Sequence, residues 1–326
     1  MTFLRLIRRI TLPGMAAAVA LTVVAACGGS DDNGDDDAAP AKLKVVATMT
    51  QIEALAREVG GDKIDLVGIL PAGADAHEFE PTASDLRAIE EADVVLRHGV
   101  GLDNWLDDTI EAGSARVVTV TDGIELKEPA LEHAGDEDGE EGEEHEGEEE
   151  GFDPHVWHDP DRAKIMVENI MAALDGADEA NEGTYDANTA AYNQKLDATK
   201  AEIQAMIDEI PAENRKLVTN HDAFGYFADA FGLEIVGAVI PSTSTDAEPS
   251  AGDTAALLET IEREGVKAIF AESSVNPGLA TTLAKDAGVT IVDDLYGDSL
   301  GEPGSGADTV DGMLLANARK IVDALK

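Results

Sequence analysis

The sequence predicts an α/β fold with two lobes, each built on a parallel sheet and joined by one long helix. Short apolar runs alternate with helical stretches in two blocks, and this alternation indicates parallel sheets covered on both faces. A single helical stretch of about 26 residues separates the two blocks. The length of 326 residues also suits about two domains of ~150 residues each.

The composition excludes several classes of protein. Asp and Glu number 67 against 23 Lys and Arg, which gives a formal net charge of −44 at pH 7. So negative a field repels phosphate and attracts cations, which excludes nucleic-acid binding and polybasic attachment to anionic lipid. Apolar residues make up 44% of the chain, enough for hydrophobic cores. The single cysteine, Cys27, can form neither an intramolecular disulfide nor a thiolate metal cluster.

Residues 1–26 have the features of a lipoprotein signal peptide. Three arginines precede an apolar run, 15–26, which is shorter than the ~20 apolar residues of a permanent transmembrane helix. The run ends in VAAC at Cys27, which resembles a bacterial lipobox, whose cysteine is lipidated. An ordinary cleaved signal that contains a cysteine is the alternative. The acidic segment 27–42 has little to bury and is expected to be a tether.

The block 43–180 is expected to form the N-terminal lobe. Within it, 13 of the 23 residues in the segment 128–150 are acidic, and the segment shows no pattern of a core or a strand. We therefore expect it to be an exposed loop, which carries His133 and His145. The predicted strands are 43–48, 65–70, 94–97 and 117–120, and the predicted helices are 51–59, 83–91, 104–112 and 161–174.

The linking helix is expected within 181–210, and the block 211–326 is expected to form the C-terminal lobe. Apolar residues from 192 to 210 recur at steps of three and four, and Pro211 ends the helical pattern. In the second lobe the predicted strands are 216–219, 234–240, 266–271 and 290–293, and the predicted helices are 223–231, 254–264, 277–287 and 307–325.

Four loops offer donors for one metal ion. His77 lies in AHEFEP, His155 in DPHVWHDP, His221 in TNHDAFGY, and Asp298 in LYGDSL after the last predicted strand. Ligands in open α/β sheets lie beyond the carboxyl ends of the strands, so two facing lobes would present these donors to the cleft between them. Three imidazoles and one carboxylate suit Zn²⁺ or Mn²⁺, whereas calcium and magnesium prefer oxygen ligands.

The motifs HEFEP, DPHVWHDP, HDAFGYF and the GDS loop resemble those of the metal-binding lipoproteins of zinc and manganese ABC importers, the cluster A-I solute-binding proteins. The resemblance covers about residues 43–326, with the motifs in the same order. It implies that His77, His155, His221 and Asp298 are the metal ligands. It also implies a protein without catalytic residues that captures a divalent transition metal and delivers it to an ABC permease and its ATPase.

The resemblance also bears on the cargo and the location. His221 at the third ligand position favours zinc, since manganese-selective members often carry glutamate there. Zinc members also commonly carry an acidic, histidine-containing loop before DPHVW, but the loop 128–150 has only two histidines, so a solvated linker is the alternative to weak zinc recruitment. Manganese is the alternative cargo. The resemblance implies attachment to the extracytoplasmic face of the cell membrane through lipid on Cys27, and we expect a monomer.

Two of the four ligands have competitors in the sequence. His158, three residues after His155, could replace it, because residues three apart on a helix share a face. Asp293 and Asp294 compete with Asp298. We favour the motif positions in both cases.

Other polar residues near the motifs are expected to support the site rather than bind the ion. His98, at the end of the strand 94–97, is expected at the rim or in a structural role. Glu78, Asp159 and Asp222 are candidates for hydrogen bonds to the imidazoles.

Two other functions compete with metal import. A zinc hydrolase would use three histidines and an open position for water, but HExxH is absent and four protein ligands close the coordination shell. A surface adhesin is the second competitor, because the family includes members named as adhesins.

Overall fold

The first sheet orders its strands β2-β1-β3-β4, all parallel. Its strands are β1 (Leu43–Ala47), β2 (Ile64–Gly68), β3 (Val94–Arg97) and β4 (Arg116–Thr119). This computed structural model describes residues 41–110, 114–131 and 151–326, of which Lys42–Lys326 form one compact unit. The predicted signal peptide, Cys27, nearly all of the tether, His133 and His145 lie outside the described residues.

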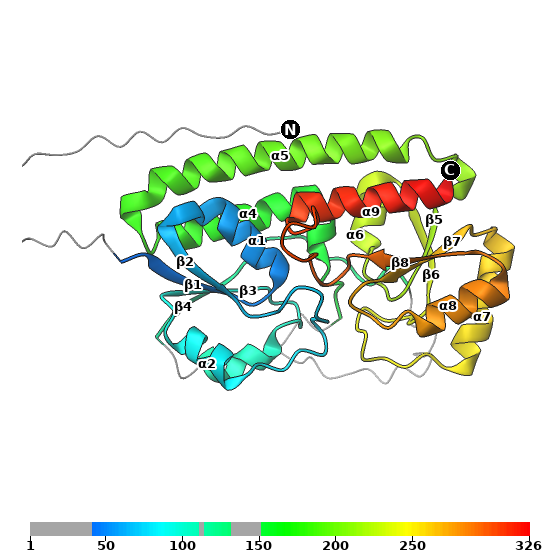
Figure 1. Cartoon of the computed structure of the whole chain (residues 1–326), viewed down its shortest axis with the longest axis horizontal. Helices are drawn as coiled ribbons and strands as arrows, with labels where there is room; N and C mark the ends of the chain where they lie inside the picture. The colour runs from blue at the N-terminus through cyan, green and yellow to red at the C-terminus, as the bar shows by residue number, and fades with distance from the viewer. Residues whose placement is uncertain (1–40, 111–113, 132–150) are drawn as a thin grey trace, which may run out of the picture. The chain divides into compact units, whose positions relative to one another are not determined.

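Successive residues of β1 face two different cores, as the two-residue period of a strand requires. Val45 belongs to a core that includes α1 (Thr50–Gly60) and α4 (Pro160–Asp175), whereas Val46 belongs to a second core that includes α2 (Ala83–Glu90). The sheet is therefore covered on both faces (Figure 1), which explains its short, continuously apolar strands.

The second sheet repeats this plan with the order β6-β5-β7-β8, again all parallel. One face packs against α6 and α9, and the other against α7 and α8, as the two cores on either side of Leu217 and Val218 show. The strands are β5 (Lys216–Thr219), β6 (Glu234–Ala238), β7 (Ala268–Glu272) and β8 (Thr290–Leu295). The helices are α6 (Gly225–Phe231), α7 (Ala251–Glu264), α8 (Gly278–Ala287) and α9 (Val310–Leu325).

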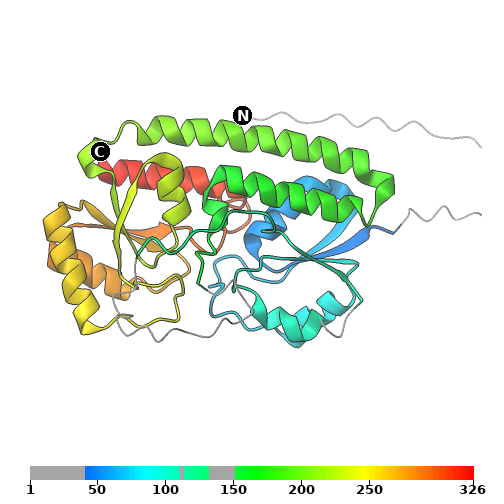
Figure 2. The same cartoon turned by 180° about the vertical axis from the view of Figure 1, so that it is seen from behind.

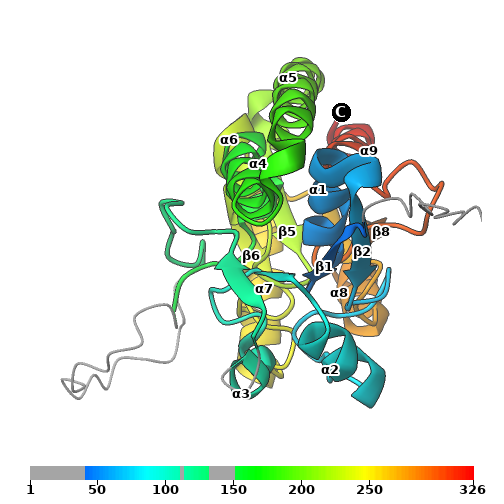
Figure 3. The same cartoon turned by 90° about the vertical axis from the view of Figure 1, so that its left-hand side faces the viewer.

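The long helix α5 (Glu182–Ile207) lies against α1, α4 and α9, and so bridges the helices of both sheets (Figures 1 and 2). Figure 3, which looks along this helix, shows it above α1 and α4. Its inward stripe repeats at steps of three and four and consists of Tyr185, Thr189, Tyr192, Leu196, Thr199, Ile203 and Ile207. The predicted fold of two parallel-sheet lobes and one long helix is confirmed.

Several element ends differ from the sequence prediction for local reasons. The long helix stops at Ile207 rather than 210, because the next residues form tighter i→i+3 turns ahead of Pro211, which disfavours helical geometry before it. Helix α7 starts at Ala251 rather than 254, because Ser250 and Asp253 form a reciprocal capping box.

Two further differences concern a predicted helix of the first lobe and the last strand of the second. The predicted helix 104–112 is a short turn of 3₁₀ helix, Asn104–Leu106, followed by α3 (Asp107–Ile110), and residues 111–113 lie outside the described residues. Strand β8 runs on to Leu295, two residues beyond the predicted end.

Within the described ranges, we find no helix that combines the length and the apolar character needed to cross a bilayer.

We predict that Ile203→Ala destabilises the metal-free protein by about 2–5 kcal/mol, because Ile203 is fully buried and its removal leaves a cavity between α5 and the lobes. Urea unfolding measures the change. The control is Gln194→Ala on the exposed face of the same helix, which should change stability by less than about 0.5 kcal/mol. Equal losses in both variants would contradict the assigned burial.

Candidate metal centre

His77, His155, His221 and Asp298 come together, each offering one donor atom, and these atoms all lie within 4.8 Å of one another. His77 lies between β2 and α2, and His155 lies just before α4. His221 follows β5 and Asp298 follows β8, so both lie beyond the carboxyl ends of strands. The four loops that the sequence singles out therefore meet at one place between the two sheets.

The donor atoms surround the Asp298 carboxylate. His155 Nε2 lies 3.1 Å from Oδ1 of Asp298, and His221 Nε2 and His77 Nε2 lie 3.4 and 3.7 Å from Oδ2. The Nε2 atoms of His155 and His221 are 3.3 Å apart. The side chains of His155, His221 and Asp298 are fully buried, and that of His77 is 9% exposed.

Two buried carboxylates fix the orientation of two of the imidazoles. His155 Nδ1 lies 2.7 Å from Asp153 Oδ1, and His221 Nδ1 lies 2.6 Å from Glu272 Oε1. With the Nδ1 proton donated to a carboxylate, the Nε2 lone pair of each ring points to the centre of the cluster. This is the tautomer that a metal ion requires.

The sequence prediction missed these two carboxylates and named other partners. Asp159 instead caps α4 by accepting from the Asp161 N–H, and Asp222 accepts from the Leu131 N–H. Among the described residues, Glu78 has no hydrogen bond to an imidazole. The available signals were Asp153 in the DPH motif, two residues before His155, and Glu272 in the AESS segment that ends β7.

The electrostatics of the metal-free cluster favour protons on His155 and His221. Burial acts to lower the pKa of His155, but Asp153 and Asp298 outweigh it and raise this pKa to about 10. For His221, Glu272 and Asp298 likewise outweigh burial and raise the pKa. Burial acts to raise the pKa of Asp298, but the neighbouring imidazoles hold it well below its usual range. A divalent cation at the centre would take the place of these protons.

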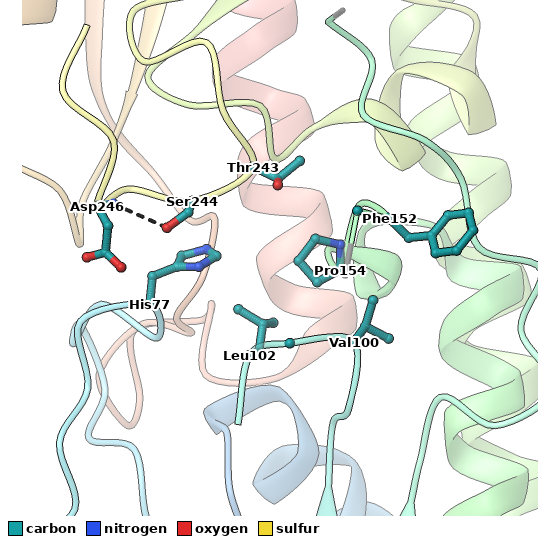
Figure 4. A pocket seen from close by; sticks show the side chains of 10 residues that line it. His77, Val100, Leu102, Phe152, Pro154, Thr243, Ser244 and Asp246 are labelled. Atoms are coloured by element: carbon teal, nitrogen blue, oxygen red, sulfur yellow. Dashed lines mark hydrogen bonds between the residues drawn. The ribbon is translucent and has the colours of Figure 1, made fainter. Parts of the chain in front are cut away.

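His77 differs from the other two imidazoles. Burial and the nearby charges of His155 and His221 lower the pKa of His77 to about 4. His77 is therefore neutral near pH 7 and has no proton to release when an ion binds. It also lines a cavity of about 230 Å³ whose walls include Leu102, Pro154 and Ser244. Figure 4 shows the His77 ring directed into this cavity, so the cluster is reached from the His77 side.

The competing residues lie outside the cluster of four. His158 is buried but stacks on Phe224, with ring centroids 4.7 Å apart and an interplanar angle of 27°. Asp293 and Asp294 are exposed within β8, and Asp294 pairs with Lys320. His98 is fully buried with Nε2 2.8 Å from the Pro154 carbonyl, so its role is structural rather than at the rim.

The donor set fits a divalent transition metal. Among the described residues, Oδ2 of Asp298 and Nε2 of His77 are buried and have no hydrogen-bond partner, an arrangement that is costly unless a cation completes it. Three imidazole nitrogens and one carboxylate match the preference of zinc and related ions.

Comparison with known proteins gives one family. The profile described as "ZnuA: Zinc-uptake complex component A periplasmic" matches residues 45–324. The manganese ABC transporter substrate-binding lipoprotein PsaA of Streptococcus mitis is 32% identical over 296 residues, 88% of this chain and 91% of that protein. The metal ABC transporter substrate-binding lipoprotein ScbA of Streptococcus cristatus is 31% identical over 289 residues, 87% of this chain and 89% of that protein.

A solved structure gives the same answer for the fold. The periplasmic zinc-binding protein TroA from Treponema pallidum matches with a TM-score of 0.77 at 30% identity, covering 87% of this chain and 99% of that one.

We predict that His158 makes the metal-free protein sensitive to acid. Burial, together with the charge of His155, lowers the pKa of His158 to about 3, so below about pH 6 the unfolded chain protonates this residue and the folded chain does not. Stability is therefore lost as the pH falls. Replacing His158 by Phe, which keeps an aromatic ring against Phe224, should reduce this loss by about 1.4 kcal/mol per pH unit between about pH 6 and 4.

Urea unfolding at several pH values measures this effect. Above about pH 6.5 the two proteins should show the same pH dependence, because His158 is then neutral in both states. Parallel stability curves through the acid range would contradict the prediction.

Proposed function

The chain belongs to the family of the periplasmic zinc-uptake component A, the metal-binding substrate-binding proteins of ABC transporters, and on this premise we propose that it binds zinc through His77, His155, His221 and Asp298 and delivers it to a membrane permease. The observation that carries the proposal is the convergence of four buried donor atoms within 4.8 Å. Members of this family are substrate-binding proteins of ABC transporters, so the chain is not an enzyme. This excludes the zinc-hydrolase alternative.

The chemistry of the ligands supports zinc over manganese. Three neutral imidazoles and one carboxylate make a nitrogen-rich set, whereas manganese is better suited by oxygen donors. Each of His155 and His221 keeps a carboxylate on Nδ1, which raises the basicity of Nε2. Manganese is the alternative cargo, since PsaA is named for manganese while TroA is named for zinc.

Capture and delivery follow from the charge and the site. The negative field of the chain, −44 overall, raises the local concentration of cations. The ion then displaces protons from the buried cluster, so binding weakens as the pH falls. The loaded protein docks on the permease, whose ATPase drives transport. Nothing in the described part of the chain favours adhesion, and we do not propose it.

The organisation of the chain fits this role. We propose that residues 1–26 are a lipoprotein signal peptide and that 27–42 tether the folded part to the membrane through lipid on Cys27. In this scheme 43–180 and 211–326 are the two lobes, 181–210 link them, and the protein acts as a monomer on the extracytoplasmic face.

We predict that the full-length chain, purified in detergent and loaded with excess metal, holds one zinc ion, and that His221→Ala loses it or binds it at least about 100-fold more weakly. Metal analysis and competitive titration with a chelator measure both quantities. His158→Phe is the matched control, since it removes a buried histidine outside the cluster, and it should keep the ion.

The same titration decides the cargo. Zinc that outcompetes an excess of manganese supports the proposed function, and preferential binding of manganese would change the cargo within the same family. A wild-type chain without stoichiometric metal would refute the proposed site.

We predict that Cys27→Ser moves the protein from the membrane fraction to the soluble fraction of expressing cells, because the thioether bond to lipid can no longer form. Fractionation followed by immunoblotting measures the distribution. The variant should bind metal as the wild type does, because Cys27 is not part of the cluster. Retention of the variant in the membrane fraction would contradict lipidation at Cys27.

A further inference from the structure

The loop that carries Asp298 is fastened to two different lobes. It leaves β8 at Tyr296, and Asn317 of α9 holds both backbone groups of that residue. The Tyr296 N–H donates to Asn317 Oδ1 at 2.9 Å, and Asn317 Nδ2 donates to the Tyr296 carbonyl at 2.7 Å. Up to Tyr296 the loop is therefore part of the second lobe.

Between Gly297 and Leu300 the loop makes hydrogen bonds to the first lobe. The Gly297 carbonyl accepts from Trp157 Nε1 at 3.1 Å, and the Leu300 N–H donates to Thr50 Oγ1 at 3.0 Å. The Gly73 N–H donates to Ser299 Oγ at 2.7 Å. Asp298 thus lies in a segment whose partners change from one lobe to the other directly before it.

Trp157 contacts both His155 and the loop that carries Asp298. Its side chain is fully buried, and its ring packs edge-on against His155 with centroids 5.4 Å apart. Its indole N–H bonds to the residue next to Asp298. One rigid side chain therefore sets the distance between two of the four clustered residues, and a buried indole N–H needs this acceptor.

Gly297 strengthens this link because its lack of a side chain allows a second group to approach closely. A side chain at this position would overlap the carboxylate of Glu272, which itself orients His221. Gly297 thus contacts both the Trp157 indole and the Glu272 carboxylate. Displacement of the loop would disturb contacts to His155 and to His221 together.

We propose that Trp157 is a positioning residue that holds Asp298 at the site and thereby sets how long the metal ion stays bound. This inference rests on the proposed function. Loss of the Trp157 N–H removes the shorter of two side-chain hydrogen bonds to the Gly297 carbonyl and leaves Gln51 Nε2, at 3.5 Å, as the other donor. The Asp298 loop then departs more often and the ion leaves faster. The total number of ions bound at saturation stays the same, because the four donor side chains remain.

The test replaces Trp157 by Phe, and also by the benzothiophene analogue of tryptophan, which keeps the shape and lacks the N–H. Zinc release from the loaded full-length chain is followed by stopped-flow mixing with a chelator. We expect release about tenfold faster or more in both variants, at unchanged stoichiometry, for the loss of one buried hydrogen bond. In the metal-free protein, amide hydrogen exchange at 298–300 should also be faster.

Tyr192→Phe is the matched control. It removes another buried hydrogen bond, from the Tyr192 hydroxyl to Asp311 Oδ1 at 3.0 Å, on α5 and outside the site. It should leave zinc release and the exchange at 298–300 unchanged, even where it lowers overall stability. A change in release equal to that of the Trp157 variants would mean that general destabilisation is responsible, and would overturn the proposal.

The two proposals fail in distinguishable ways. A benzothiophene variant that releases zinc at the wild-type rate and exchanges at the wild-type rate refutes the role of Trp157 while leaving metal binding intact. A wild-type chain that binds no zinc refutes the proposed function, and with it the role of Trp157 in release, whatever the exchange at 298–300 shows.

Discussion

Charge buried between the two sheets has to be balanced where it lies. Asp298, Asp153 and Glu272 are carboxylates with almost no exposure, and removing such a group from water costs several kcal/mol unless a positive charge is close. His155 and His221 lie between them, each with one carboxylate at Nδ1 and Asp298 at Nε2. The raised pKa values of His155 and His221 favour protons that balance this charge, and in the proposed site a divalent ion would replace those protons.

The frame that holds this charge is rigid for reasons that lie in the packing. One hydrophobic core runs through α1, α4, α5 and α9 and includes Leu55 of the first lobe and Met313 of the second. Because α5 lies against helices of both lobes, a wide hinge opening would expose part of that core to water. Small local movements, such as those of the loop around Asp298 and of His77 beside its cavity, would open the proposed site without exposing this core.

The segment before α4, which carries His155, makes hydrogen bonds with both lobes. The Pro154 carbonyl lies 2.8 Å from His98 Nε2 of the first lobe, and the Asp153 carbonyl accepts from the Tyr226 hydroxyl of α6 at 2.9 Å. His155 is thus placed by groups from both sides. The loop of Asp298 is likewise hydrogen-bonded to both lobes. A movement of one lobe relative to the other would therefore shift both His155 and Asp298.

The sequence alone determined the alternation of strands and helices, the stripe of α5, and the four loops at His77, His155, His221 and Asp298, because these depend on local periodicity and on motifs read along the chain. Tertiary structure decided which carboxylates support the imidazoles and which of the nearby acids faces them. Glu272 reaches His221 across 51 positions, and Trp157 reaches Gly297 across 140. Contacts at such separations depend on how two sheets dock, and local periodicity carries no information about docking.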